Sequence, residues 1–270
     1  MGKIGNIAKK VIVFCLIAII IVSGYNVGKS LYGYYKGRKA YDSLSNLAQV
    51  DPRMTEFTGV VDFDALQKVD PNVIGWLYMK DSHINYPVVQ GSDNSTYLHR
   101  LIDGKYNAAG TLFVDYRCER NFGGFNTIIY GHNMKDGSMF SDISSSRNKS
   151  FFDKHKRLEL ITPDAKYHVE PIAFIETDAS SDLYATSYSS DSAKQAFIDT
   201  VMAKSYYKTG NTATASDRLI SMSTCVRATG DDRFIMVGKL VPWTDKEIKT
   251  GEAIQAKIDA ANARKNKKQK

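Results

Sequence analysis

Apolar residues follow three different patterns along this chain, and each pattern is confined to one region. An unbroken apolar run covers residues 11–22, and together with residues 23–28 it is long enough to cross a bilayer. Between residues 72 and 242, short segments rich in β-branched and aromatic residues alternate with polar positions, which is typical of strands. Residues 246–263 are rich in alanine, which favours a helix.

The β region holds about eight predicted strands at fairly even spacing, and this spacing favours a single mainly β barrel over a parallel sheet. The predicted strands are residues 73–79, 84–89, 110–115, 126–130, 158–162, 166–176, 218–225 and 233–240. A helix is predicted at residues 193–204, inserted in the loop before the last two strands, where Ser190 or Asp191 can cap its first turn.

The chain outside the barrel, which is expected to cover residues 72–242, is predicted to be largely helical. We expect a short tail at 1–10, an uncleaved transmembrane signal-anchor at 11–28, a helical subdomain at 29–71, and a helical extension with a basic tail at 243–270. A cleaved signal peptide is the alternative, although Val22-Ser23-Gly24 is a poor cleavage site. Basic residues flank the apolar run on both sides, so the positive-inside rule does not decide its orientation. We expect a single-pass protein with its catalytic domain outside, because the N-terminal tail is short and because of the chemistry that the domain is expected to perform.

The basic charge of the chain lies at its two ends. The formal net charge is +7, yet residues 1–40 alone carry +7 and residues 264–270 carry +5, so residues 41–263 carry −5. This distribution indicates a membrane flank and a solvated tail, and it argues against nucleic-acid binding. The sequence has no Cys-x-x-Cys or His-x-x-x-His spacing and no carboxylate cluster with calcium-loop spacing, so we expect no metal and no cofactor.

Candidate chemistry gathers around the last hairpin. Cys225 ends one predicted strand and Arg233 opens the next, so the hairpin brings a thiol next to a fixed cation, which is an arrangement typical of an activated nucleophile. Arg227, inside the connecting loop, is the competing arginine. His132 follows a strand directly after Gly131, where a bend would carry its imidazole out of the barrel wall. The other histidines, at 83, 99, 155 and 168, have polar neighbours and are predicted to lie on the surface.

Several ordered motifs resemble the class B sortases, and the similarity covers roughly residues 72–240. The motifs are residues 126–134 around His132, the triplet Ser223-Thr224-Cys225, Arg233, residues 86–91 with Asp93-Asn94, the pair Tyr97-Leu98, and residues 113–117. The resemblance implies an eight-stranded sortase-type barrel and a cysteine transpeptidase that fixes surface proteins to the cell wall.

By this resemblance Cys225 attacks the carbonyl after a threonine in a C-terminal sorting signal and forms a thioester. His132 exchanges protons with the leaving and incoming amines, and Arg233 stabilises the oxyanion. Substrate contacts are expected from Asn94 and Leu98 on one wall, from Ser223 and Thr224 beside the nucleophile, and from Leu183 and Tyr184 in the loop 178–210. Ser223 shares a strand face with Cys225, which favours it over Thr224.

Three alternatives accompany this interpretation. A pilus-assembly sortase, which joins pilin subunits through a lysine amine, would use the same catalytic residues as an enzyme whose acceptor is a cell-wall precursor. An inactive membrane-tethered binding module would have a structural Cys225, or a disulfide between Cys118 and Cys225. A papain-type hydrolase is disfavoured because its cysteine comes early and begins a helix, whereas Cys225 is late and ends a strand.

Overall fold

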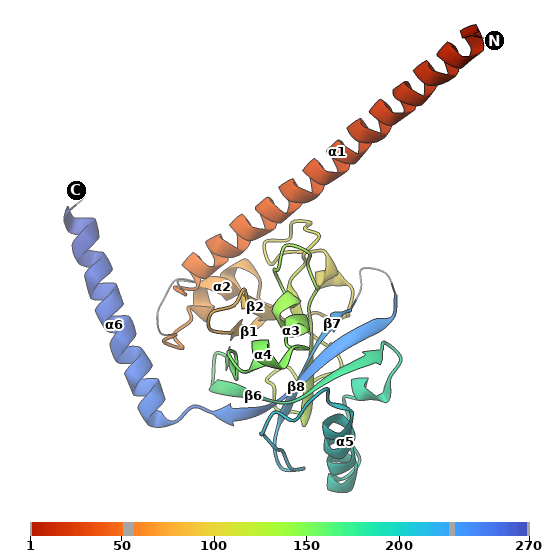
Figure 1. Cartoon of the computed structure of the whole chain (residues 1–270). Coiled ribbons are helices and arrows are strands. Elements are labelled where there is room, and N and C mark those ends of the chain that lie inside the picture. Colours follow the sequence, from red (N-terminus) through yellow and green to blue (C-terminus); the bar gives the residue numbers. More distant parts are fainter. Residues whose placement is uncertain (1, 51–56, 227–229, 269–270) are drawn as a thin grey trace.

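The computed structural model describes residues 2–50, 57–226 and 230–268, with side chains for residues 9–264 of these ranges. Its strands are β1 (Val73–Tyr78), β2 (Asn85–Val89), β3 (Leu112–Val114), β4 (Asn126–Tyr130), β5 (Leu158–Ile161), β6 (Lys166–Asp178), β7 (Leu219–Cys225) and β8 (Asp232–Pro242). In this part of the chain the eight strands close into a barrel in the order β1-β2-β3-β4-β7-β8-β6-β5 (Figure 1). The predicted mainly β barrel is therefore confirmed.

Strand pairing in the barrel is mixed. The pairs β2–β3 and β4–β7 are parallel, and the other neighbours in the barrel are antiparallel. Every residue of β1, β3 and β5 is buried, so both faces of these strands are covered. The core is filled by large side chains such as Trp76, Phe174 and Phe234, each with no exposed surface.

Helices occupy the connections and the ends of the described chain. They are α1 (Gly2–Leu47), α2 (Phe63–Val69), η1 (Thr96–Leu98), α3 (Ser141–Ser145), α4 (Lys149–Phe152), η2 (Asp182–Tyr184), α5 (Asp191–Lys204) and α6 (Asp245–Lys268). The predicted inserted helix is α5, between β6 and β7, and the Ser190 side chain caps it by accepting a hydrogen bond from the Ala193 amide at 3.1 Å. Both η2 and α5 belong to the long β6–β7 connection.

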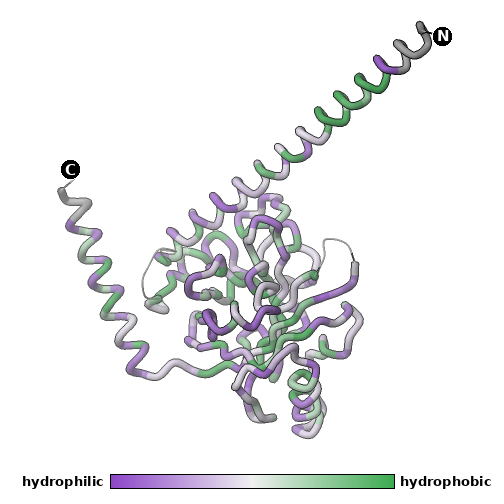
Figure 2. The backbone as a smooth tube through the Cα atoms, viewed as in Figure 1, coloured by the Kyte–Doolittle hydropathy of each residue, from purple (hydrophilic) through white to green (hydrophobic). Residues whose placement is uncertain are grey.

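Helix α1 runs without a break from Gly2 to Leu47, so a single helix covers the predicted tail, the predicted span and the first part of the predicted helical subdomain. Residues 9–32 are exposed throughout, and Figure 2 shows the apolar stretch on the part of the helix that projects away from the barrel. From Gly37 onward the helix packs on the domain, where the Tyr41 ring meets the Tyr86 ring edge-on at 4.8 Å and the Tyr41 hydroxyl donates to the Gly110 carbonyl. The exposed apolar stretch is long enough for a bilayer and fits a membrane anchor.

The C-terminal helix α6 begins with a capping box. The Thr244 amide donates to the Glu247 carboxylate at 2.8 Å, and the Glu247 amide donates back to the Thr244 hydroxyl at 3.3 Å. One turn later, Gly251 lies so close to the Thr58 carbonyl that a Cβ atom there would be 2.1 Å from it. The first half of α6 is therefore fixed to the domain, and its second half projects away (Figure 1).

His168 links this helix to the barrel, which corrects its expected place on the surface. The residue is 7% exposed, and its ring lies 2.7 Å from a Glu159 carboxylate oxygen and 3.0 Å from a Glu247 carboxylate oxygen and stacks on Trp243. Burial works to lower the pKa of His168, but the hydrogen bonds to Glu159 and Glu247 outweigh burial and raise this pKa above its ordinary value. The period-2 pattern of β6 indicates that the side chain of His168 lies on the opposite face of the strand from those of its two neighbours. It does not reveal that α6 covers the face on which His168 lies.

His168→Gln is expected to lower the free energy of unfolding by about 1–2 kcal/mol at pH 6, because charge-assisted hydrogen bonds to two carboxylates are lost. Since the folded-state pKa is raised, this contribution is fully present below about pH 6.5 and is lost as the pH rises through the folded-state pKa. Thermal unfolding between pH 5 and pH 9 measures it. The control is His99→Gln, because the His99 ring packs against the Tyr106 and His132 rings and has no ion pair among the described residues. Equal pH dependence in the two variants would contradict the assignment.

Candidate active site

The candidate nucleophile Cys225 and the candidate arginine Arg233 lie opposite each other in the last hairpin. Cys225 ends β7 and Arg233 lies near the start of β8, and the antiparallel register pairs them directly. The Arg233 Nη1 donates to the Gly230 carbonyl at 3.0 Å and to the Asp232 carbonyl at 3.2 Å, so the loop backbone holds the guanidinium. The thiol of Cys225 is partly exposed and free. The predicted placement of a thiol beside a fixed cation is thus present.

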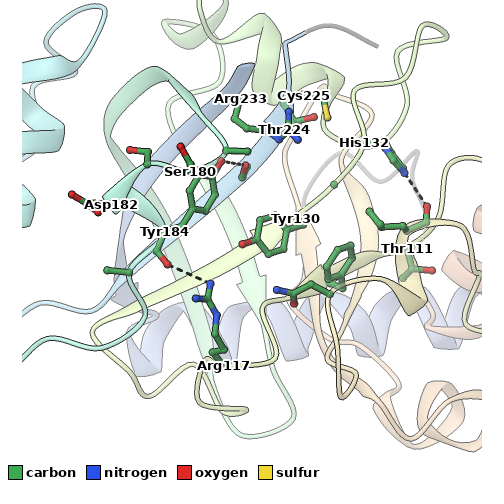
Figure 3. Close-up of a pocket in the computed structure, with 18 residues that line it drawn as sticks. Thr111, Arg117, Tyr130, His132, Ser180, Asp182, Tyr184, Thr224, Cys225 and Arg233 are labelled. Carbon is green, nitrogen blue, oxygen red and sulfur yellow. Dashed lines mark hydrogen bonds between the residues drawn. The ribbon is translucent and has the colours of Figure 1, made fainter. Parts of the chain in front are cut away.

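His132 reaches the same end of the barrel through a parallel strand pair. Tyr130 is opposite Ser223 in the β4–β7 register, so the residues two positions further on, His132 and Cys225, emerge side by side (Figure 3). Two hydrogen bonds continue this alignment, from the Gly131 amide to the Ser223 carbonyl at 3.1 Å and from the Asn133 side chain to the Cys225 carbonyl at 3.0 Å.

Gly131 serves close packing, which differs from the bend expected from the sequence. Its φ is not among the positive values of the chain, but a Cβ atom at this position would lie 2.5 Å from Leu112 Cδ2 and 2.6 Å from Phe140 Cδ2. Such distances are far below van der Waals contact, so only glycine fits. The absence of a side chain lets the segment that carries His132 lie tightly against the barrel.

The imidazole of His132 has one nitrogen fixed and the other available. Its Nε2 is 2.9 Å from the Leu98 carbonyl, and because a carbonyl can only accept, Nε2 carries the proton and Nδ1 holds the lone pair of the neutral ring. Burial lowers the pKa of His132, the hydrogen bond to Leu98 works in the opposite direction, and His99, stacked at 5.4 Å, lowers this pKa further. At neutral pH the ring is therefore mainly neutral and can accept a proton at Nδ1.

All three side chains line one cavity of about 760 Å³, a size typical of a ligand site. The other lining residues are Asn94, Leu98, Thr111, Phe113, Arg117, Tyr130, Gly131, Ala179, Ser180, Ser181, Asp182, Tyr184, Ala185, Ser223 and Thr224. In Figure 3, Thr224, Cys225 and Arg233 lie together on one side of the cavity, and the β6–β7 loop with Ser180, Asp182 and Tyr184 forms another wall. The cavity is open to solvent.

Five of the six expected substrate contacts line this cavity, and the sixth does not. Asn94, Leu98, Ser223, Thr224 and Tyr184 are all among the lining residues, and Tyr184 belongs to the loop wall. Leu183 is 5% exposed and packs into the core cluster under the loop, so it anchors the loop instead of facing the cavity. The η2 turn explains this, since consecutive residues of a tight turn point in different directions.

Ser223 and Thr224 both line the cavity, and they differ in how their hydroxyls are used. The Ser223 Oγ is hydrogen-bonded to the Tyr184 hydroxyl at 2.8 Å. The Thr224 Oγ1 is buried and has no hydrogen-bond partner among the described residues. The Thr224 hydroxyl oxygen thus has no surface open to the cavity, and Thr224 stays a predicted substrate contact only through its place in the lining beside Cys225.

Asp115, Arg117 and Tyr130 lie within the motifs quoted above, but the sequence analysis assigned no role to them. Arg117 and Tyr130 line the cavity, and both hydrogen-bond to the buried carboxylate of Asp115. The available signal was an Asp-x-Arg spacing directly after a predicted strand, together with a tyrosine that ends the strand preceding His132. Neither signal is specific without the knowledge that β3 and β4 are neighbours.

The remaining sequence candidates are easily placed. Cys118 and Cys225 are both free, so the alternative of a disulfide between them is wrong in this structure. Burial raises the pKa of the Cys118 thiol to about 11, which makes it a poor nucleophile. Arg227 lies outside the described residues. Within the described residues, no group of three or more His, Cys, Asp or Glu side chains could hold a metal ion.

Comparisons with known proteins agree with this geometry. The family model described as Sortase domain matches residues 77–241. Sortase B of Listeria monocytogenes is 31% identical over 243 residues, which are 88% of this chain and 99% of the relative, and Sortase B of Staphylococcus aureus is 28% identical over 228 residues, which are 84% and 93%.

Solved structures are similar over the same part of the chain. The crystal structure of sortase B from Bacillus anthracis in complex with AAEK1 is 34% identical with a TM-score of 0.70, and the match covers 79% of this chain and 100% of that chain. The Staphylococcus aureus sortase B-substrate complex is 27% identical, also with a TM-score of 0.70, and the match covers 78% and 98%.

Proposed function

Because this chain belongs to the sortase family, as a class B member and a cell-wall sorting transpeptidase, we propose that Cys225, His132 and Arg233 carry its reaction. The observation that carries the assignment is their convergence: a free thiol, a half-buried imidazole and a guanidinium held by the loop backbone line one cavity. Each comes from the end of a different strand or from the segment just after one, so the barrel fixes their relative positions.

In the first half of the reaction, the Cys225 sulfur attacks the carbonyl carbon after the threonine of a sorting signal. The thiol proton passes to the free Nδ1 of His132, and the carbonyl π electrons move onto the oxygen. The Arg233 guanidinium donates to this oxyanion, for which its planar fork and permanent charge are suited. Collapse of the intermediate breaks the peptide bond, the leaving amine takes the proton from His132, and a thioester on Cys225 remains.

In the second half, an acceptor amine attacks the thioester carbonyl. His132, neutral again, removes a proton from the amine, and the Cys225 thiolate leaves and is reprotonated. The lowered pKa of His132 supports this cycle, because the ring gives up each proton readily. We propose an amine of the cell-wall precursor as the acceptor, with the barrel on the outer side of the membrane to which the α1 helix anchors it.

The peptide is proposed to lie along the cavity between Asn94 and Leu98 on one side and Tyr184 on the other. Ser223 and Thr224, which both line the cavity next to Cys225, are proposed to contact the peptide beside the scissile bond. Figure 3 supports this placement in part, since Tyr184 of the β6–β7 loop lies on a different side of the cavity from Cys225 and Arg233.

Trapping the acyl-enzyme tests the proposal. The full chain is incubated with a panel of sorting-signal peptides, quenched with acid, and analysed by intact-mass and peptide-mapping mass spectrometry. We expect an adduct on Cys225 with the mass of the peptide up to its threonine, and its transfer to an added wall-precursor amine. Transfer to a pilin lysine with no transfer to the precursor would favour pilus assembly. The absence of any adduct on Cys225 would refute the proposed reaction.

A further inference from the structure

A buried carboxylate lies behind the cavity and takes no part in the proposed chemistry. Asp115, directly after β3, has no exposed surface and accepts hydrogen bonds from the Nε and Nη2 atoms of Arg117 at 2.9 and 2.8 Å. The Tyr130 hydroxyl donates to the same carboxylate at 2.9 Å. Burial works to raise the pKa of Asp115, but the hydrogen bonds from Arg117 and Tyr130 outweigh burial and lower it, so the charge is retained.

Both partners of Asp115 extend to the same residue of the cavity wall. The Arg117 Nη2 also donates to the Tyr184 carbonyl at 3.4 Å, and the Tyr130 ring stacks on the Tyr184 ring with centroids 6.1 Å apart. At its far end, the Tyr184 hydroxyl is bonded to the Ser223 Oγ at 2.8 Å. Tyr184 is therefore held at its backbone, its ring and its hydroxyl, and Figure 3 shows these side chains side by side.

Through these polar contacts, Tyr184 attaches the loop wall to the barrel. Tyr184 ends η2, and the neighbouring Leu183 anchors η2 from the other side through apolar packing. An arginine is required at position 117, because two of its nitrogens must meet the carboxylate in one plane while one of them also reaches the carbonyl. A lysine offers a single nitrogen and cannot reproduce this fork.

We propose that Asp115 and Arg117 are positioning residues, which hold Tyr184 and with it the β6–β7 loop wall in the place that receives the sorting-signal peptide. The proposal rests on the proposed function, since it assigns to this wall a role in binding that peptide. Neither residue is expected to touch the reacting atoms, because their side-chain hydrogen bonds go to Tyr130, Tyr184 and each other. Their loss should therefore weaken peptide binding and spare the chemical step.

Arg117→Gln is the variant that tests the proposal. We expect the KM for a sorting-signal peptide to rise by about 10-fold while kcat stays within about 3-fold, because binding common to ground and transition states is lost. The rate of alkylation of Cys225 by iodoacetamide should be unchanged. The matched control is Arg120→Gln, because Arg120 donates to the Gln90 and Pro71 carbonyls and does not line the cavity.

A second readout separates positioning from a general structural effect. The Kd of a fluorescent sorting-signal peptide is measured by anisotropy in the Cys225→Ala background, with Arg117→Gln and Tyr184→Ala singly and together. If Arg117 acts through Tyr184, the double variant should bind no more weakly than Tyr184→Ala alone. An unchanged Kd and KM in Arg117→Gln, or losses that multiply in the double variant, would overturn the proposal.

Two further outcomes remain decisive. If Arg117→Gln fails to fold, Tyr130→Phe replaces it, because this change keeps the ring stack and removes one hydrogen bond to Asp115; its Kd should rise by about 3-fold, and no rise would overturn the proposal. If the unmodified chain binds the peptide without cleaving it, the proposed function fails, while the Kd comparison still tests the positioning role.

Discussion

Cys225→Ala is expected to abolish cleavage of a sorting-signal peptide, with turnover reduced by at least about 10⁴-fold. The reaction needs an atom that bonds to the substrate carbonyl and later leaves, and among the described residues of the cavity no other cysteine lines it. The remaining groups, His132 and Arg233, could only assist direct attack by water. The loss of turnover is measured by monitoring the release of the product peptide by chromatography over several hours.

Cys118→Ala provides the matched control for this variant. It also removes a thiol, but Cys118 is 9% exposed, does not line the cavity, and contacts the backbone of β4 through its sulfur. We expect it to retain most of the activity. Turnover by Cys225→Ala above the detection limit, or equal losses in the two variants, would sink the assignment of the nucleophile.

Arg233→Ala is expected to lower kcat/KM by about 10²–10³-fold, because the oxyanion loses its charged donor. Arg233→Lys should recover only part of this loss, since an ammonium group lacks the planar fork. Arg227→Ala is the comparison that separates the two arginines of the hairpin, and it should retain most of the activity. Equal losses in Arg233→Ala and Arg227→Ala, measured with the same peptide, would reopen the choice between them.

Local sequence patterns were enough to predict that Cys225 lies beside Arg233, but they were not enough to predict that His132 lies beside Cys225. The first depends on a hairpin, whose two strands and turn are all coded locally. The second depends on the parallel β4–β7 pair, which joins segments about ninety residues apart and leaves no trace in local alternation. The resemblance to known sortases supplied that link from the sequence, and the register explains it physically.

The surroundings of Leu183 and Asp115 could not be predicted from the sequence pattern. Leu183 and Tyr184 are neighbours in a turn, and only the packing of η2 on the core beneath decides which one faces the cavity. Asp115 looks like an ordinary polar residue after a strand, and its burial follows from Arg117 and Tyr130, which the fold brings to it from a loop and a second strand. Tertiary contacts, not propensities, settle such cases.

The unbroken course of α1 makes the connection to the barrel a stiff strut. With residues 11–28 inside a bilayer, the free turns at 29–36 would add about 12 Å of rigid spacer before Gly37 meets the domain. Because the helix has no hinge, its tilt in the bilayer would also fix the orientation of the barrel. The groove would therefore keep a nearly constant height and orientation relative to the membrane surface. The height of the groove above the bilayer, and so the distance at which it meets its substrates, would then depend on the number of residues in this one helix.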